Sequence, residues 1–126
     1  MTEDFTKIID KQEKFFNLHK TVSYHFRKDS LKTLYNILKK NELKISKALY
    51  EDLGKSSKEA YYFEIGPVLK EISLAQISLK KWMQSKQTPN PLLLFWLQSK
   101  LKPCPLGRIL IIGTWNYPFF LTMMPL

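Results

Sequence analysis

The most informative stretch of the chain is PLGRILIIGTWNYPF, residues 105–119. The apolar run over residues 106–112 is rich in isoleucine and leucine and carries one charge, Arg108, which predicts a buried strand. Asn116 and Pro118 follow, and this order is typical of a helix start, because asparagine caps free N–H groups and proline needs no partner there. The stretch therefore predicts a strand, a sharp turn with a carboxamide, and a helix start that offers unpaired N–H groups.

The same stretch resembles the aldehyde dehydrogenase superfamily, most closely its class 3 and fatty-aldehyde branch. Trp-Asn-Tyr-Pro behind an apolar run, residues 115–118, is the most specific part of the match, and it is followed by Leu121 and residues 125–126. Shorter pieces similar to that branch occur upstream in the same order, at Arg27 and at residues 52–56, 59–61, 64–66, 71–72 and 82–83. The resemblance covers almost the whole chain but only the first part of such an enzyme.

This resemblance implies an α/β fold for the whole enzyme, whereas the present chain is expected to be mainly α-helical with one or two strands. Residues 1–86 are expected to form an N-terminal helical layer. Residues 87–104 then form a linker and oligomerisation strand region, and residues 105–126 begin the NAD(P)-binding βα unit.

Helical periodicity dominates the chain before residue 87. Apolar residues near a 3.6-residue spacing predict a helix from Thr2 to about Leu18 and three further helices, with kinking or restarting at Pro67. Ser23 is expected to cap the second helix, which runs to about Lys40, Gly54 to end the third (42–53), and Ser56 to open the fourth.

Two prolines mark the only clear linker, residues 87–91, which is expected to be extended. Residues 98–102 beyond it are consistent with a strand or hairpin. Between them, Leu92 to Trp96 is strongly apolar and suits burial against a partner subunit. The family resemblance places the oligomerisation strands here, so a homo-oligomer is expected.

The formal net charge is +9, and 18 of the 20 cationic residues are lysines spread along the helices. Solvated helix faces are favoured over a surface for an acidic partner, and nucleic acid is not expected, because its recognition favours arginine. The single cysteine, Cys104, fits a reducing compartment. Neither a membrane span nor a secretory signal is expected, so the predicted location is cytoplasmic.

Aldehyde oxidation in the resembled superfamily passes through an oxyanion formed when a cysteine thiolate adds to the aldehyde. By family correspondence Asn116 stabilises that oxyanion, because a carboxamide N–H is a neutral donor. The same correspondence implies that Tyr117 and Leu121 line the aldehyde entry, and that NAD or NADP lies along Ile112, Gly113, Thr114 and Trp115. No metal ligand set is expected.

The residues alone also allow a purely structural interpretation of this stretch. Asn116 can be only a helix cap, with Trp115 and Tyr117 as core aromatics. Four glutamates invite interpretation as catalytic carboxylates, but their spacing favours pairing with lysines on helix faces; they are Glu51, Glu59, Glu64 and Glu71.

The family's nucleophilic cysteine and general base both lie in segments that this chain does not contain. Cys104, flanked by two prolines, is not at a catalytic position of the family. We therefore expect no aldehyde dehydrogenase activity from residues 1–126 on their own. Two alternatives remain open: a non-catalytic chain that pairs with another through Leu92 to Trp96, and a basic helical module that binds nucleic acid or an anionic membrane.

Overall fold

The computed structural model describes residues 5–92 and 96–125, and helices form most of it. The helical elements are α1 (Phe5–Asn17), η1 (Lys20–Val22), α2 (Tyr24–Lys40), α3 (Glu42–Leu53), α4 (Ser57–Ala60), the π-helical turn η2 (Tyr61–Ile65), α5 (Gly66–Trp82) and α6 (Pro118–Met123). Two short strands, β1 (Lys86–Thr88) and β2 (Ser99–Leu101), complete it. The expectation of a mainly helical chain with one or two strands is confirmed. None of the described helices has the length and apolar character that crossing a membrane requires.

The predicted helix boundaries are confirmed where the capping residue is adjacent in sequence to the helix that it caps. The Ser23 hydroxyl accepts the N–H of Phe26 at 3.5 Å, and the Ser56 hydroxyl accepts the N–H of Glu59 at 3.3 Å. Gly54 ends α3 with a left-handed φ of 67°, which costs glycine little because it has no Cβ. Pro67 is the second residue of α5, so the predicted restart of the helix there is also confirmed.

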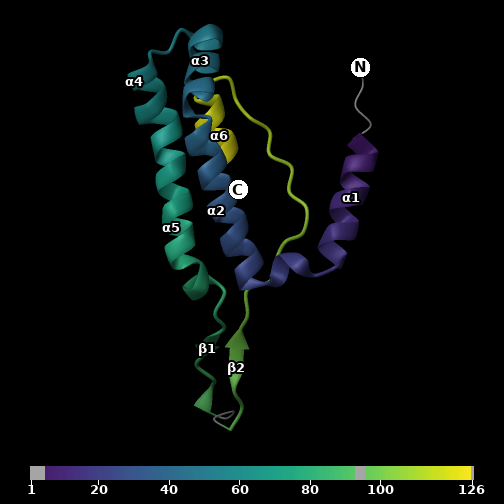
Figure 1. Ribbon diagram of the computed structural model, residues 1–126. Coiled ribbons are helices and arrows are strands. Elements are labelled where there is room, and N and C mark those ends of the chain that lie inside the picture. The colour runs from purple at the N-terminus through teal and green to yellow at the C-terminus, as the bar shows by residue number, and fades with distance from the viewer. Residues whose placement is uncertain (1–4, 93–95, 126) are drawn as a thin grey trace.

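The core lies between α2 and α5, which run antiparallel in the column of helices seen in Figure 1. Its buried members come mainly from α5 and the turn before it, and they are Leu38, Ile65, Val68, Leu69 and Ile72. The C-terminal helix α6 closes one side of this core with Phe119, Phe120 and Met123.

The strands β1 and β2 form an antiparallel hairpin below the helices (Figure 1). Lys86 pairs with Leu101 and Thr88 pairs with Ser99, which confirms the strand or hairpin expected around residues 98–102. In the predicted oligomerisation stretch, Leu92 is 93% exposed and Trp96 is 64% exposed. Residues 93–95 of that stretch lie outside the described residues.

The predicted buried strand over residues 106–112 is wrong for this structure. Residues 102–117, which we call the extended segment, contain no helix or strand and run alongside the helices up to α6 (Figure 1). Leu110 is 84% exposed and Ile112 is 82% exposed. A strand is held by hydrogen bonds to a neighbouring strand, and the described residues contain no strand paired with this segment.

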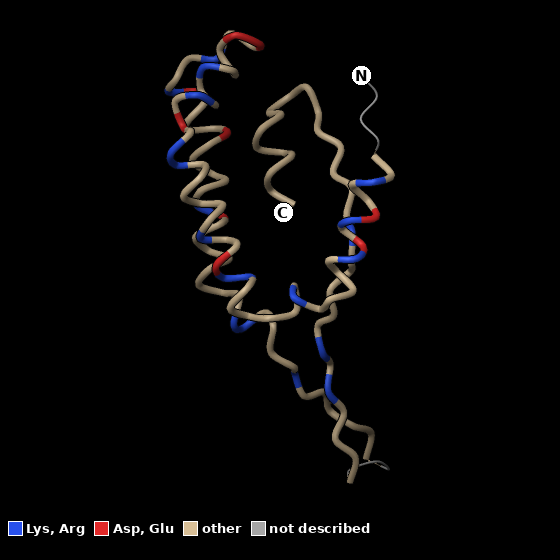
Figure 2. Tube along the Cα trace, turned by 45° about the vertical axis from the view of Figure 1, so that its right-hand side comes forward, with Lys and Arg blue, Asp and Glu red and all other residues tan. Residues whose placement is uncertain are grey.

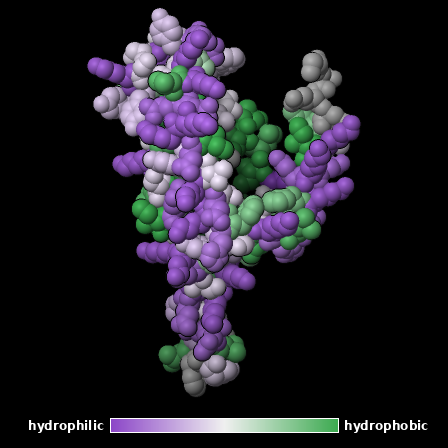
Figure 3. Space-filling view, viewed as in Figure 1, coloured by the Kyte–Doolittle hydropathy of each residue, from purple (hydrophilic) through white to green (hydrophobic). Residues whose placement is uncertain are grey.

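The first helix, α1, packs on the extended segment more than on the core. Arg108 of that segment donates to the backbone oxygen of Ile9 at 3.2 Å and pairs with Glu13 at 3.3 Å. Figure 2 shows the two chain segments side by side, and Figure 3 shows apolar surface gathered in the hollow between α1 and the column of helices. No residue of α1 is buried, so its predicted helix forms without joining the core.

Candidate functional site

The predicted site lies at the turn that leads into α6. Thr114 Oγ1 donates to the backbone oxygen of Asn116 at 2.7 Å, which closes a tight turn before the helix. Asn116 itself is exposed. Its side chain is therefore not sealed among packed neighbours, and the segment before it is not helical, so neither of the two arrangements that would exclude a functional carboxamide is present.

Tyr117 is the N-cap of α6, and its backbone is left-handed with φ 49° and ψ 54°. Such a conformation costs a non-glycine residue roughly 1–2 kcal/mol, so contacts elsewhere must hold it. The Tyr117 ring supplies them: Lys55 Nζ lies 4.2 Å from its centroid, and the Phe63 ring lies 6.4 Å away. The loop before α4 and the turn η2 thus fix the entry to α6.

The predicted capping role of Asn116 is wrong, because no side chain at the N-cap bonds to the start of α6. Glu64 takes that role instead, from 55 residues upstream. Its Oε2 accepts the N–H of Phe119 at 2.9 Å and the N–H of Phe120 at 3.4 Å. The sequence predicted a helix start with unpaired N–H groups. Glu64 binds those of Phe119 and Phe120, so they are not available to a ligand.

Glu64 is fully buried, and its other oxygen, Oε1, is ion-paired with Lys55. The Lys55 side chain is only 12% exposed, so this pair is largely shielded from water. A buried carboxylate is tolerated when charged and hydrogen-bonding partners replace its water, and here one ammonium and two backbone N–H groups do so.

The prediction that Glu64 lies on a lysine-rich helix face is therefore wrong. The same prediction is confirmed for Glu51, which pairs with Lys47 one turn away at 3.6 Å. The two cases differ because the main partners of Glu64 belong to α6, far along the chain, and no periodicity within η2 indicates them. The available signal was its place between Phe63 and Ile65 in an otherwise apolar turn.

The predicted cofactor residues lie together on the last part of the extended segment. Ile112 and Thr114 are exposed, and Trp115 is 92% exposed. Gly113 lies against α6, where a Cβ added to it would come within 2.5 Å of Thr122 Oγ1. The absence of a Cβ at Gly113 thus allows the segment to lie close to α6.

The predicted substrate residues are brought together on the first turn of α6. The N–H of Leu121 donates to the backbone oxygen of Tyr117 at 3.0 Å. Leu121 is 42% exposed and Tyr117 is partly buried. The spacing of four predicted that they share one side of the helix, and this backbone bond is consistent with it.

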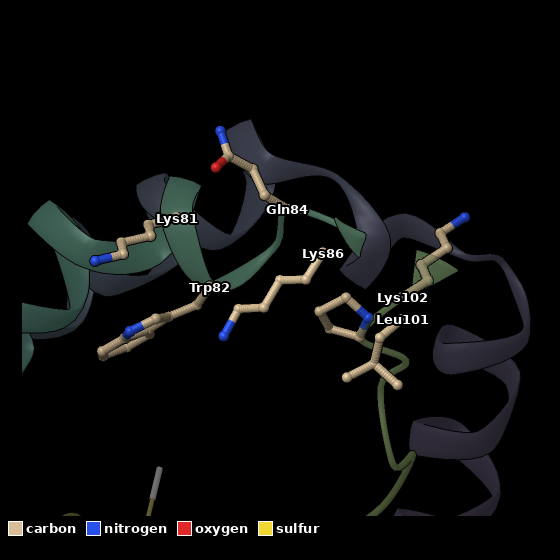
Figure 4. Close-up of a pocket in the computed structure, with 7 residues that line it drawn as sticks. Lys81, Trp82, Gln84, Lys86, Leu101 and Lys102 are labelled. Atoms are coloured by element: carbon tan, nitrogen blue, oxygen red, sulfur yellow. The ribbon is translucent and has the colours of Figure 1, made fainter. Parts of the chain in front are cut away.

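The candidate site residues do not line either of two pockets found among the described residues. A pocket of about 400 Å³ lies between α3 and α6, with Asp52, Phe119 and Thr122 in its lining. Another, of about 550 Å³, lies where α5 meets the hairpin, lined by Lys81, Trp82, Gln84, Lys86, Leu101, Lys102 and Pro103 (Figure 4). The candidate site is an exposed turn, open on the side away from the core.

Comparisons with known proteins bear on the whole chain. The family model described as the aldehyde dehydrogenase family matches residues 1–126. The 4,4'-diaponeurosporen-aldehyde dehydrogenase of Staphylococcus aureus is 46% identical over 112 residues, which is 89% of this chain and 24% of that protein. Aldehyde dehydrogenase family 3 member F1 of Arabidopsis thaliana is 35% identical over 126 residues, which is 100% of this chain and 26% of that protein.

A solved structure gives the same result for the fold. The substrate-bound state of Staphylococcus aureus AldH superposes with a TM-score of 0.92 at 43% identity, covering 99% of this chain and 27% of that one. The chain thus spans about a quarter of the length of the curated relatives it matches.

Proposed function

The chain belongs to the aldehyde dehydrogenase family, with class 3 members among its relatives, and on that premise we propose that it forms one part of an NAD(P)-dependent aldehyde dehydrogenase. In this proposal Asn116 stabilises the oxyanion that forms when the aldehyde carbon is attacked. The observation that carries the proposal is the exposed Asn116 side chain, which stands at a turn whose backbone is held on both sides.

The chemistry requires a fixed donor that adds no charge of its own. The carboxamide N–H of Asn116 meets that requirement, whereas an aspartate there would repel the oxyanion. Glu64 already engages the N–H groups of Phe119 and Phe120, so the donor in this proposal is the side chain and not the start of α6.

The surface before the turn suits a nucleotide cofactor. Ile112 and Trp115 leave exposed apolar side chains along an extended backbone, a surface that fits the flat rings of NAD or NADP. In this proposal these residues, with Gly113 and Thr114, hold the cofactor, and Tyr117 and Leu121 line the entry of the aldehyde. A cofactor held there would supply the hydride acceptor for the oxidation of the aldehyde.

We also propose that residues 1–126 have no dehydrogenase activity alone. The chain matches only about a quarter of its relatives. The family resemblance implies that the nucleophilic cysteine and the general base belong to the other three quarters. Cys104 is exposed on the extended segment, with its sulfur 3.7 Å from the backbone oxygen of Lys102. No general base accompanies that thiol among the contacts of the described residues, so it does not replace the missing nucleophile.

A chimera tests the role of Asn116. Residues 1–126 replace the matching quarter of the Staphylococcus aureus 4,4'-diaponeurosporen-aldehyde dehydrogenase, and turnover is followed by the reduced cofactor formed. Asn116→Ala is expected to lower kcat by about a hundredfold or more, as loss of one oxyanion donor does. Asn36→Ala, at an exposed position of α2, is the matched control and should leave kcat unchanged. An unchanged kcat for Asn116→Ala in an active chimera would refute the proposed role.

A second candidate function is that of a non-catalytic pairing partner, and the exposure of Leu92 and Trp96 favours it. Apolar side chains this exposed at a hairpin are common at protein interfaces. Size-exclusion chromatography at two protein concentrations should show a shift toward a dimer at the higher one. Leu92→Lys should abolish the shift, and a concentration-independent monomer in the unsubstituted chain would exclude this function.

A further inference from the structure

The buried pair of Glu64 and Lys55 links the helical layer to the candidate site. Charged groups are seldom fully buried, and Glu64 is 0% exposed. The carboxylate bridges two parts of the chain that are far apart in sequence, since it binds Lys55 through one oxygen and the start of α6 through the other.

The helix α6 has no charged residue of its own and is only six residues long. Figure 2 shows this end of the chain without charges, while the acidic and basic residues gather on the longer helices. A helix this short is unstable alone, because few of its backbone groups bond internally. Its position depends on the packing of its apolar residues on the core and on what binds its first N–H groups, and Glu64 binds two of them.

We propose that Glu64 is a positioning residue for the carboxamide of Asn116, an inference that rests on the proposed function. Two restraints converge on the turn. Glu64 holds the backbone of Phe119 and Phe120 on one side of Tyr117, and Lys55, fixed by its ion pair with Glu64, holds the Tyr117 ring.

The position of the Asn116 carboxamide determines how well it can stabilise the oxyanion. An oxyanion donor must be held within about 0.5 Å of its productive position, and a displacement of about 1 Å can lower the rate about a hundredfold. Asn116 precedes Tyr117 directly, so a shift of the α6 start moves its Cα. The carboxylate itself is buried and does not meet substrate, which separates it from a catalytic residue.

The test is a double-mutant cycle in the chimera described above. Glu64→Asp keeps the charge but shortens the side chain by one methylene, which draws the α6 start away from its present position. Alone it should lower kcat by about ten- to a hundredfold, with KM changed less than about twofold. In an Asn116→Ala background it should lower kcat by less than about twofold, because the group it positions is gone.

Each other outcome is decisive. Equal losses from Glu64→Asp in both backgrounds, or no loss in either, would overturn the positioning role while leaving that of Asn116 intact. An unchanged kcat for Asn116→Ala alone would overturn both. Glu59→Asp, at an exposed position of α4, is the control and should change nothing. If Glu64→Asp does not fold, Glu64→Gln enters the same cycle with the same expectations, because it keeps an acceptor oxygen but loses the ion pair.

Discussion

The helical layer from α2 to α5 and the extended segment contain similar apolar residues but bury them very differently. Ile65 and Val68 are at most 1% exposed, whereas Leu110 and Ile112 are more than 80% exposed. A helix satisfies its backbone internally and needs only a neighbouring helix to cover its apolar side. A strand takes its backbone hydrogen bonds from other strands, and the extended segment pairs with none among the described residues. Much of its apolar surface is therefore left exposed.

The short helix α6 joins these two regions. It follows the extended segment in sequence, yet its aromatic residues pack on the helical core. The buried ion pair secures that attachment, so the two regions meet at Glu64. The following substitutions test how far each region depends on the other.

The largest expected effect comes from breaking this junction. Lys55→Met leaves the Glu64 carboxylate buried without its counter-charge and should lower the free energy of unfolding by about 3–5 kcal/mol, measured by urea denaturation. Lys47→Met removes the exposed partner of Glu51 and should cost less than about 1 kcal/mol. Equal small losses in both variants would show that the buried pair does not join the regions.

The contrast in burial predicts the next effect. Ile65→Ala opens a cavity in the core and should lower the free energy of unfolding by about 2–5 kcal/mol. Ile112→Ala, the same change in the extended segment, should stay within about 0.5 kcal/mol. A comparable loss at Ile112 would mean that the segment is packed in solution, and the contrast between the regions would then fail.

The smallest expected effect concerns the turn between α3 and α4. Gly54 has a φ of +67° and no atom within 4 Å of an added Cβ, so Gly54→Ala introduces backbone strain without a clash. It should lower the free energy of unfolding, measured by urea denaturation, by about 1–2 kcal/mol. Gly54→Asn should cost less, since asparagine adopts this conformation more readily. Equal losses for the two variants would show that something other than the backbone limits this turn.

Features that depend on neighbouring residues were predicted correctly from the sequence. The Ser23 cap, the left-handed Gly54 and the restart of the helix at Pro67 each involve groups within one helical turn. The string Trp-Asn-Tyr-Pro likewise indicated the family that the whole-chain comparison supports. The strand or hairpin expected around residues 98–102 is also present, as β2 paired with β1.

Features that depend on distant partners were not predicted. The apolar run over residues 106–112 has the composition of a strand, but composition does not provide the neighbouring strand. Asn116 was expected to cap α6, and the true cap, Glu64, lies in a different helical element. No pattern within either segment shows that a carboxylate and a helix start 55 residues apart will meet.

The amino-acid order was therefore enough to specify the helices and their local ends, because short-range hydrogen bonds and side-chain periodicity act within a few positions. The family and the residues proposed to carry the chemistry came from the resemblance of the string Trp-Asn-Tyr-Pro and the pieces upstream of it. The folded arrangement alone revealed how the site is held: Glu64 loses its water in the core, and its charge is then compensated by Lys55 and by the start of α6. Burial makes that compensation necessary, and burial is a property of the assembled chain, not of any one segment.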